Sequence, residues 1–137
     1  VFIGTIITDL DFNITNKKVE LCEHCGACAV KCTSGCIGSK SRDDCVSRIT
    51  QTKGRLEPYK EKILVKSGMV WGCDRCQEVC PHNVNARINP HPCFGGVRFG
   101  HSLSKDILSD LSNKAYGWRG ISVLKRNLEL INSKKPK

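Results

Sequence analysis

Residues 21–36 read LCEHCGACAVKCTSGC and place five cysteines within sixteen positions. The first four are spaced C-x2-C-x2-C-x3-C: Cys22, Cys25, Cys28 and Cys32. This spacing is typical of bacterial iron–sulfur proteins, in which three thiolates bind one [4Fe-4S] cluster and the fourth binds another. Zinc sites more often use separate CxxC pairs, and a secreted disulfide scaffold would carry a signal for secretion. The spacing therefore favours iron–sulfur clusters over zinc or disulfides.

A second cysteine run is needed to complete this arrangement. It stands in GCDRCQEVCPHN, residues 72–83, where one upstream ligand is still missing. Cys45 is the candidate for that ligand. We predict that cluster one is bound by Cys22, Cys25, Cys28 and Cys80, and cluster two by Cys32, Cys45, Cys73 and Cys76. Residues four apart share a helical face, so short helices through residues 28–32 and 76–80 can bridge the two clusters.

Two cysteines and three glycines are left without a fixed role. Cys36 and Cys93 are expected to be small apolar side chains rather than ligands, because spare cysteines are usually buried. Gly26, Gly35 and Gly72 either let the backbone approach the cluster sulfurs or mark simple turns, and the sequence favours neither explanation.

The chain has 137 residues and a formal net charge of +9. Its length suits a small domain with a modest core. No apolar run is long enough to span a membrane and no signal peptide opens the chain, so we expect a cytoplasmic monomer without membrane contact. The opening VFIGTIITDL suggests a strand cut from a larger protein, since the first residue is Val1.

The expected fold is α+β and mostly helical: a bacterial 2[4Fe-4S] ferredoxin-like module followed by a small helical tail. Residues 1–15 are predicted to form a strand left from an upstream domain, residues 16–95 the cluster module, and residues 96–137 a helical segment with a basic tail. Within the module, residues 57–68 predict a helix that ends at Gly68.

Two further helices are predicted in the last segment. One covers residues 102–117 and the other residues 118–133. Their apolar side chains recur at helical spacing and should face the core: Leu103, Ile107, Leu108 and Leu111 in the first, and Ile121, Leu124, Leu128 and Ile131 in the second.

The order CxxCxxCxxxC, DxxxC and GCDxCQxVCPxN resembles the epoxyqueuosine reductase family. The ending AYGWRGISVLKRNLELI is similar to the family's helix after the clusters, so the resemblance covers almost the whole chain. Reductive dehalogenases share the double-cluster module, but the ending favours the tRNA-modifying enzymes. This sequence departs from the family pattern at Thr33, where Pro is usual, at Cys36, where a small apolar residue is usual, and at His82, where an aromatic residue is common.

The resemblance implies an oxidoreductase that reduces epoxyqueuosine to queuosine at the wobble position of a tRNA, using cobalamin and two [4Fe-4S] clusters. It also implies a protein electron donor such as flavodoxin or ferredoxin. In that family the catalytic acid and most corrin contacts precede the cluster module, so we expect this chain to be a fragment without the catalytic domain and to contain no catalytic residue. The alternative is a stand-alone 2[4Fe-4S] electron carrier of ferredoxin type.

The positive net charge of the chain is relevant to the expected binding of tRNA. Eight ligating thiolates and two oxidised clusters reduce the net charge to about +5, which still suits an RNA backbone. We name Arg119, Lys125 and Arg126 as candidates for contact with the tRNA anticodon loop. An ordinary solvated basic face is the competing explanation. Trp118 should either lie along the RNA surface or anchor the last helix in the core.

Overall fold

The structure is a computed structural model, and it describes residues 5–11, 21–39, 41–87, 111, 114 and 116–133. Five α-helices are found there: α1 (Ala27–Lys31), α2 (Val46–Gln51), α3 (Pro58–Ser67), α4 (Arg75–Glu78) and α5 (Ile121–Ser133). Two 3-10 turns, η1 (Pro81–Asn83) and η4 (Gly117–Arg119), complete the elements. The mostly helical class is thus confirmed.

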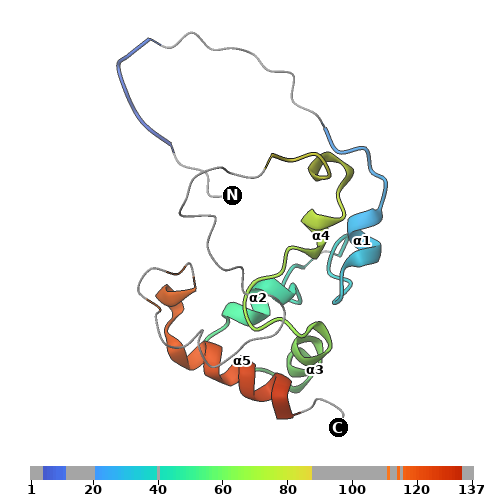
Figure 1. Cartoon of the computed structure of the whole chain (residues 1–137), viewed down its shortest axis with the longest axis vertical. Helices are drawn as coiled ribbons and strands as arrows, with labels where there is room; N and C mark the ends of the chain where they lie inside the picture. Colours follow the sequence, from blue (N-terminus) through green and yellow to red (C-terminus); the bar gives the residue numbers. More distant parts are fainter. Residues whose placement is uncertain are drawn as a thin grey trace.

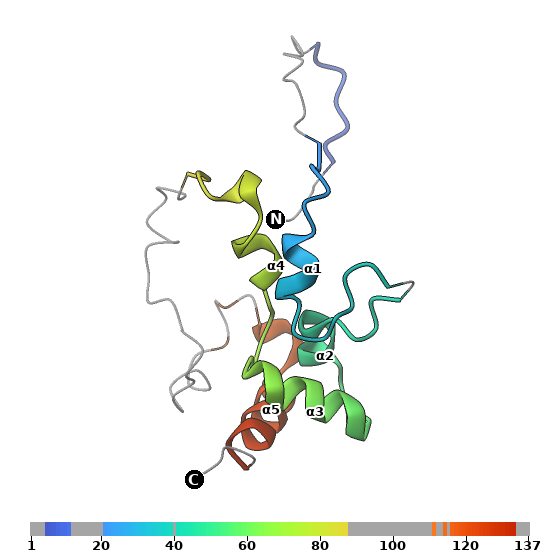
Figure 2. The same ribbon diagram turned by 90° about the vertical axis from the view of Figure 1, so that its right-hand side faces the viewer.

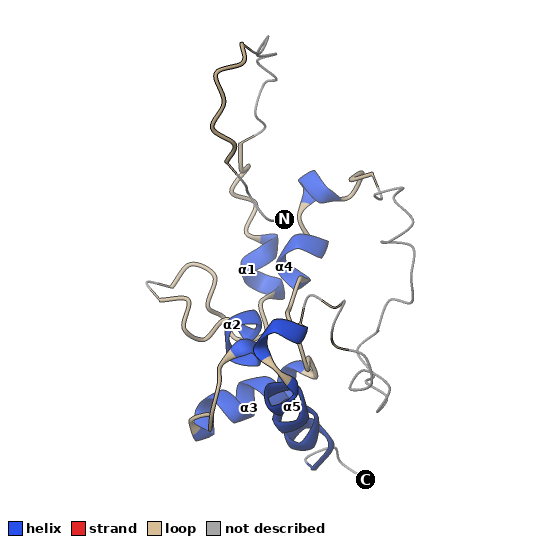
Figure 3. Cartoon of the chain, turned by 90° about the vertical axis from the view of Figure 1, so that its left-hand side faces the viewer, coloured by secondary structure: helices blue, strands red, loops and turns tan. Residues whose placement is uncertain are grey.

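The described residues hold no strand, as the colouring of Figure 3 makes visible. The α+β part of the predicted fold is therefore not confirmed. Residues 5–11, the described part of the strand expected over residues 1–15, have no regular structure, and Ile6 and Ile7 are 87% and 97% exposed. A strand is stable only when neighbouring strands pair with its backbone groups, and no such neighbour is found among the described residues.

The helix predicted over residues 57–68 is confirmed as α3. Pro58 occupies the first turn, where its missing N–H costs no helical hydrogen bond. Gly68 ends the helix in the left-handed conformation with φ of 67°, and its N–H donates to the carbonyls of Leu64 and Val65. This is the expected glycine cap, which a side chain at that φ would strain.

The core lies where α2, α3 and α5 meet, at the lower end of the molecule in Figures 1 and 2. Its buried apolar side chains are Ile49, Leu56, Leu64, Val70, Leu124 and Ile131. Trp71 packs against its edge and meets the Tyr116 ring edge-on, with 6.1 Å between the ring centroids. The core thus joins the predicted cluster module to the last helix. The boundary expected between residues 95 and 96 lies outside the described residues, so the division into domains stays a prediction.

The apolar face predicted for the last helix is partly wrong. Leu124 and Ile131 are buried and Leu128 packs against the core, but Ile121 is 38% exposed. Val123 and Asn127 are buried instead. The helix begins only after Gly120, so Ile121 stands in its first turn at the margin of the core. Of the helix predicted over residues 102–117, Leu103, Ile107 and Leu108 lie outside the described residues, whereas Leu111 packs against the core.

None of the helices in the described part of the chain has the length and apolar composition of a membrane span.

Candidate metal centre

Two short helices bring the cysteine runs together. Cys28 lies in α1 and Cys32 directly follows it, whereas Cys76 lies in α4 and Cys80 stands two residues beyond its end. The two helices pack side by side above the core in both views of Figures 1 and 2. Neither helix contains a buried residue, so apolar burial on the helices themselves does not explain their pairing.

Next to α1 and α4 lies a cavity of about 500 Å³ lined by seven cysteines. They are Cys28, Cys32, Cys36, Cys45, Cys73, Cys76 and Cys80. All four ligands predicted for cluster two therefore line the same cavity, although they come from four places between residues 32 and 76. All nine cysteines of the described residues are free thiols. The tenth, Cys93, lies outside the described residues.

The four ligands predicted for cluster one are less gathered. Cys28 and Cys80 line the cavity, but Cys22 and Cys25 are exposed and precede α1. Positive φ values occur on both sides of Cys25, with φ of 54° at His24 and of 75° at Gly26. The His24 N–H donates to the Cys22 sulfur at 3.4 Å. The conformation thus directs one backbone N–H toward the sulfur of a predicted ligand.

His82 links the first cysteine run to the second. Its Nε2 atom lies 3.8 Å from a carboxylate oxygen of Glu23. Glu23 follows Cys22, and His82 follows the Cys80-Pro81 pair. This contact therefore connects the two segments that are predicted to share cluster one. The sequence alone does not show this contact, because His82 and Glu23 are 59 positions apart along the chain.

The cysteine geometry suits a cluster better than a single ion. No group of three or more His, Cys, Asp or Glu side chains in the described residues converges closely enough to hold one metal ion. In a [4Fe-4S] cluster each thiolate binds a different iron, so the sulfurs stand farther apart than around zinc. A cavity walled by many thiols, without a close tetrahedral set, fits the donor chemistry of such a cluster.

The thiols in the cavity differ in acidity. Burial opposes ionisation of Cys32, but hydrogen bonds from Ser34, the Ile37 backbone and Cys36 outweigh it and lower the pKa of Cys32 to about 7. Burial raises the pKa of Cys36 and of Cys76. The Cys36 sulfur lies 3.7 Å from that of Cys32. This arrangement suits Cys36 as a neutral thiol that supports the thiolate of Cys32.

Arg75 crosses the cavity between the two runs. Its guanidinium donates to the Thr33 hydroxyl and to the Ser67 carbonyl, the latter at 2.9 Å, and both Arg75 and Thr33 line the cavity. Thr33 stands where the resembling family usually has Pro, and the hydroxyl gives Arg75 an acceptor that Pro would lack. Sequence reasoning missed this pair because neither residue type is a metal ligand.

The glycines predicted near the clusters can now be compared. Gly26, Gly35 and Gly72 all have positive φ, between 66° and 75°. A Cβ added at any of them would meet no protein atom within 4 Å. The backbone conformation, rather than close packing against the chain, is therefore what requires glycine there.

A buried hydrogen-bond network holds the segment before Cys73 in place. We call this network, formed by Asn127, Thr50, Val70 and Gly72, the Asn127 brace. The buried amide of Asn127 donates to the carbonyls of Thr50 and Val70, each at 2.8 Å. The Thr50 hydroxyl in turn accepts the N–H of Gly72 at 3.0 Å. Helix α5 thereby holds the residues that lead into the second cysteine run, a function that the apolar pattern of α5 does not reveal.

Arg126 belongs to the same brace. Its guanidinium donates to the carbonyls of Thr52 and Gly54 and to the side-chain oxygen of Asn127. Since these internal bonds occupy the guanidinium, an RNA contact by Arg126 would have to replace them. Arg126, predicted from the sequence to contact RNA, therefore has a structural role as well.

The other two RNA candidates differ in exposure. Lys125 is exposed, and the Arg119 guanidinium stacks over the Trp118 ring at 3.9 Å. Trp118 itself is 65% exposed. Of the two roles expected for Trp118, the structure therefore excludes that of anchoring the last helix in the core.

Comparison with known proteins agrees with the cysteine pattern. Residues 21–83 match the family model of the 4Fe-4S double cluster binding domain. An uncharacterised protein in the gldA 3′ region of Geobacillus stearothermophilus is 28% identical over 93% of the chain and 63% of its own length. No solved structure matches the chain.

Several curated relatives carry the name epoxyqueuosine reductase. The protein of Bacillus anthracis is 33% identical over 93% of this chain, and that of Listeria monocytogenes is 29% identical over 96%. The chain spans 36% and 37% of the length of these two relatives. The resemblance found in the sequence is thereby confirmed.

Proposed function

Because the chain is related to the epoxyqueuosine reductases and contains a double cluster binding domain, we propose that it is the iron–sulfur electron-transfer portion of an enzyme of that kind. The proposed reaction reduces epoxyqueuosine to queuosine at the wobble position of a tRNA in the cytoplasm. The alternative is a stand-alone carrier with two clusters and no substrate of its own.

The main support for this proposal is that Cys32, Cys45, Cys73 and Cys76 all line one cavity. We propose that these four bind cluster two and that Cys22, Cys25, Cys28 and Cys80 bind cluster one, crossed as in a bacterial two-cluster ferredoxin. When bound, the clusters supply one-electron transfer. The chain's own residues hold them, keep the two clusters adjacent through α1 and α4, and place Arg75 beside the thiolates.

The proposed reaction needs two electrons, since removing the oxygen of an epoxide to leave an alkene is a two-electron reduction. Two adjacent clusters suit the delivery of electrons in succession. Cobalamin enters the proposal only through the family resemblance. Residues 5–11, the described part of the segment expected to leave a cobalamin domain, do not line the cysteine cavity, so we assign no corrin contact to this chain.

Two features support the tRNA partner. The chain is basic, with a net charge of +9 before cluster binding, and Lys125 and Trp118 are exposed on neighbouring turns near the start of α5. An exposed aromatic ring beside cationic side chains suits contact with unstacked bases of a loop. We propose these as the RNA-facing groups.

A chimera tests the proposal. The part of the Bacillus anthracis epoxyqueuosine reductase that aligns with this chain is replaced by residues 1–137, and the chimera is expressed in a strain that accumulates epoxyqueuosine. We expect queuosine in the tRNA, measured by mass spectrometry of nucleosides, and none with Cys76→Ser in the chimera. Failure of a folded chimera with both clusters would favour the stand-alone carrier.

A further inference from the structure

A second cavity adjoins the one lined by cysteines. It has a volume of about 530 Å³ and is lined by Arg42, Cys45, Ser47, Arg48, Gln51, Thr52 and Arg119. Arg42 and Cys45 line both cavities, so a molecule seated in the second would lie beside a proposed ligand of cluster two. We call the second cavity the arginine pocket.

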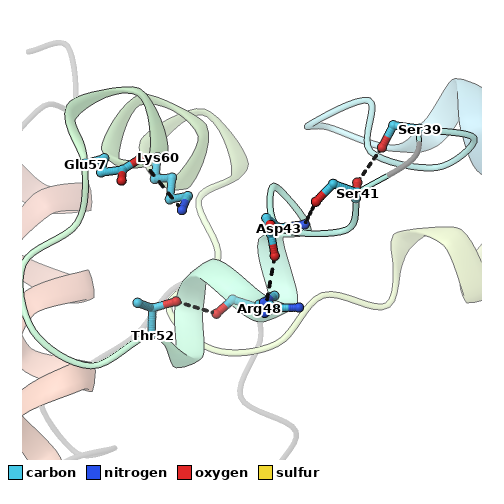
Figure 4. A network of polar contacts seen from close by, with 7 residues as sticks. All are labelled: Ser39, Ser41, Asp43, Arg48, Thr52, Glu57 and Lys60. Carbon is cyan, nitrogen blue, oxygen red and sulfur yellow. Dashed lines mark hydrogen bonds and ion pairs between the residues drawn. The ribbon is translucent and has the colours of Figure 1, made fainter.

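The arginine pocket is built for an anionic partner. Three arginines and no carboxylate line it. Asp43 lies 3.2 Å from the Arg48 guanidinium (Figure 4), but both side chains are well exposed, at 60% and 67%. Such an exposed pair contributes little stability, so an incoming carboxylate can replace Asp43 at low cost.

Arg119 has an unused hydrogen-bond donor at the pocket. Its Nε atom is buried and has no hydrogen-bond partner among the described residues. Its guanidinium carbon lies 3.9 Å from the centroid of the exposed Trp118 ring. This contact holds the Arg119 side chain in place at the pocket that it lines.

The position beside Cys45 identifies the class of partner. An electron donor must come close to a cluster, because electron transfer slows steeply with distance. A phosphate of an RNA backbone gains nothing from that closeness. Electron-transfer partners form small contacts guided by opposite charges, which matches a pocket with three arginines at its wall and rim.

We propose that Arg42, Arg48 and Arg119 form the docking surface for an acidic electron-donor protein, which reduces the cluster held by Cys32, Cys45, Cys73 and Cys76. In each encounter the donor loses one electron and the cluster gains one. This inference rests on the proposed function only in so far as cluster two is present.

The test is the rate of cluster reduction in the loaded protein. Reduced flavodoxin, an acidic protein, serves as the probe, and stopped-flow absorbance follows the clusters. For Arg42→Gln combined with Arg48→Gln, we expect the second-order rate constant at low salt to fall about tenfold, with a flatter dependence on ionic strength. Arg119→Gln should add to the loss. The rate with reduced methyl viologen, a small cationic reductant, should not fall, because removing positive charge does not repel a cation.

A matched control removes two charges elsewhere. Lys62 and Lys66 are exposed on α3 and do not line the pocket, so Lys62→Gln combined with Lys66→Gln should retain the flavodoxin rate. Equal losses in both double variants would show a general charge effect and overturn the proposal. An unchanged flavodoxin rate with weakened binding of an anticodon stem-loop RNA would overturn it too, and would assign the pocket to RNA. The reduction assay contains no epoxyqueuosine. Its result therefore does not depend on whether the chimera forms queuosine.

Discussion

Replacing Asn127 should show how much the hydrogen bonds of its side chain contribute to stability, apart from the apolar packing of α5. The side chain is fully buried and donates to two carbonyls, those of Thr50 and Val70. It also accepts from the Arg126 guanidinium at 2.7 Å. Asn127→Ala removes all of these bonds at once and leaves the two carbonyls without their donor.

The expected cost follows from these contacts. A buried group that loses its hydrogen-bond partner costs about 1–3 kcal/mol, and a bond to a charged group contributes about 1.5–3 kcal/mol. The carbonyls recover part of this loss if the structure relaxes or water enters. We therefore expect Asn127→Ala to lower the free energy of unfolding by roughly 3–4 kcal/mol, a large part of the 5–15 kcal/mol typical of a domain.

The measurement is anaerobic urea unfolding of the cluster-loaded protein, followed by far-ultraviolet circular dichroism. Asn132→Ala is the matched control, since Asn132 is exposed on the same helix; its effect should stay within about 0.5 kcal/mol. Asn127→Asp tests the donors alone, because it keeps the shape and places acceptor oxygens against the two carbonyls. A loss below about 1 kcal/mol in both Asn127 variants would refute the brace.

Three further predictions concern the clusters. The loaded chain should contain about eight iron and eight sulfide, for two [4Fe-4S] clusters; about four of each, or stoichiometric zinc, would contradict the assignment. Cys80→Ser should damage the cluster assigned to Cys22, Cys25 and Cys28, whereas Cys36→Ser should leave both clusters intact, as read by electron paramagnetic resonance of the reduced variants; cluster loss in the Cys36 variant would make Cys36 a ligand. Arg75→Gln should lower the reduction potential of the cluster in the cysteine cavity by roughly 50 mV, because it removes a positive charge that favours the reduced form, and about 59 mV corresponds to 1.4 kcal/mol for one electron. Arg75→Lys should keep most of the potential, and equal shifts in both variants in a redox titration would exclude a charge effect.

The cysteine spacing predicts more of the site than any other pattern. It specifies which thiols must meet, because a cluster requires four ligands at fixed geometry whatever the surrounding fold. Because the second run lacks one ligand, this requirement groups Cys45 with the thiols that line the cavity. The helix at residues 58–67 is equally predictable, since Pro58 and Gly68 have local conformational reasons for their positions.

Other features depend on partners that a linear pattern does not contain. Asn127 is polar and falls outside any apolar pattern, but its amide satisfies two buried carbonyls from distant segments. Arg75 and Thr33 pair across 42 positions. Ile121 has the correct helical spacing but stands in the first turn of α5, where the core ends. Each case needs three-dimensional neighbours to be recognised.

The two halves of the described structure are stabilised by different means. Helices α2, α3 and α5 share a core in which Ile49, Leu64 and Leu124 are almost completely buried. Helices α1 and α4 bury no residue at all. Metal binding stabilises a fold when its ligands are otherwise unsupported, so the clusters should stabilise α1 and α4 far more than the rest.

Cluster removal should therefore unfold the chain in part. After anaerobic chelation, hydrogen exchange measured by mass spectrometry should show loss of protection in peptides that cover residues 27–31 and 75–78. Peptides that cover residues 58–67 and 121–133 should stay protected, because the apolar core and the Asn127 brace need no metal. Equal loss in all four segments would show that the clusters support the whole fold, and equal retention would show that α1 and α4 are held by contacts other than the clusters. Either result would contradict the division into a part with an apolar core (α2, α3 and α5) and a part stabilised by metal (α1 and α4). Selective loss of protection at α1 and α4 would show that metal ligation replaces an apolar core in that part of the molecule.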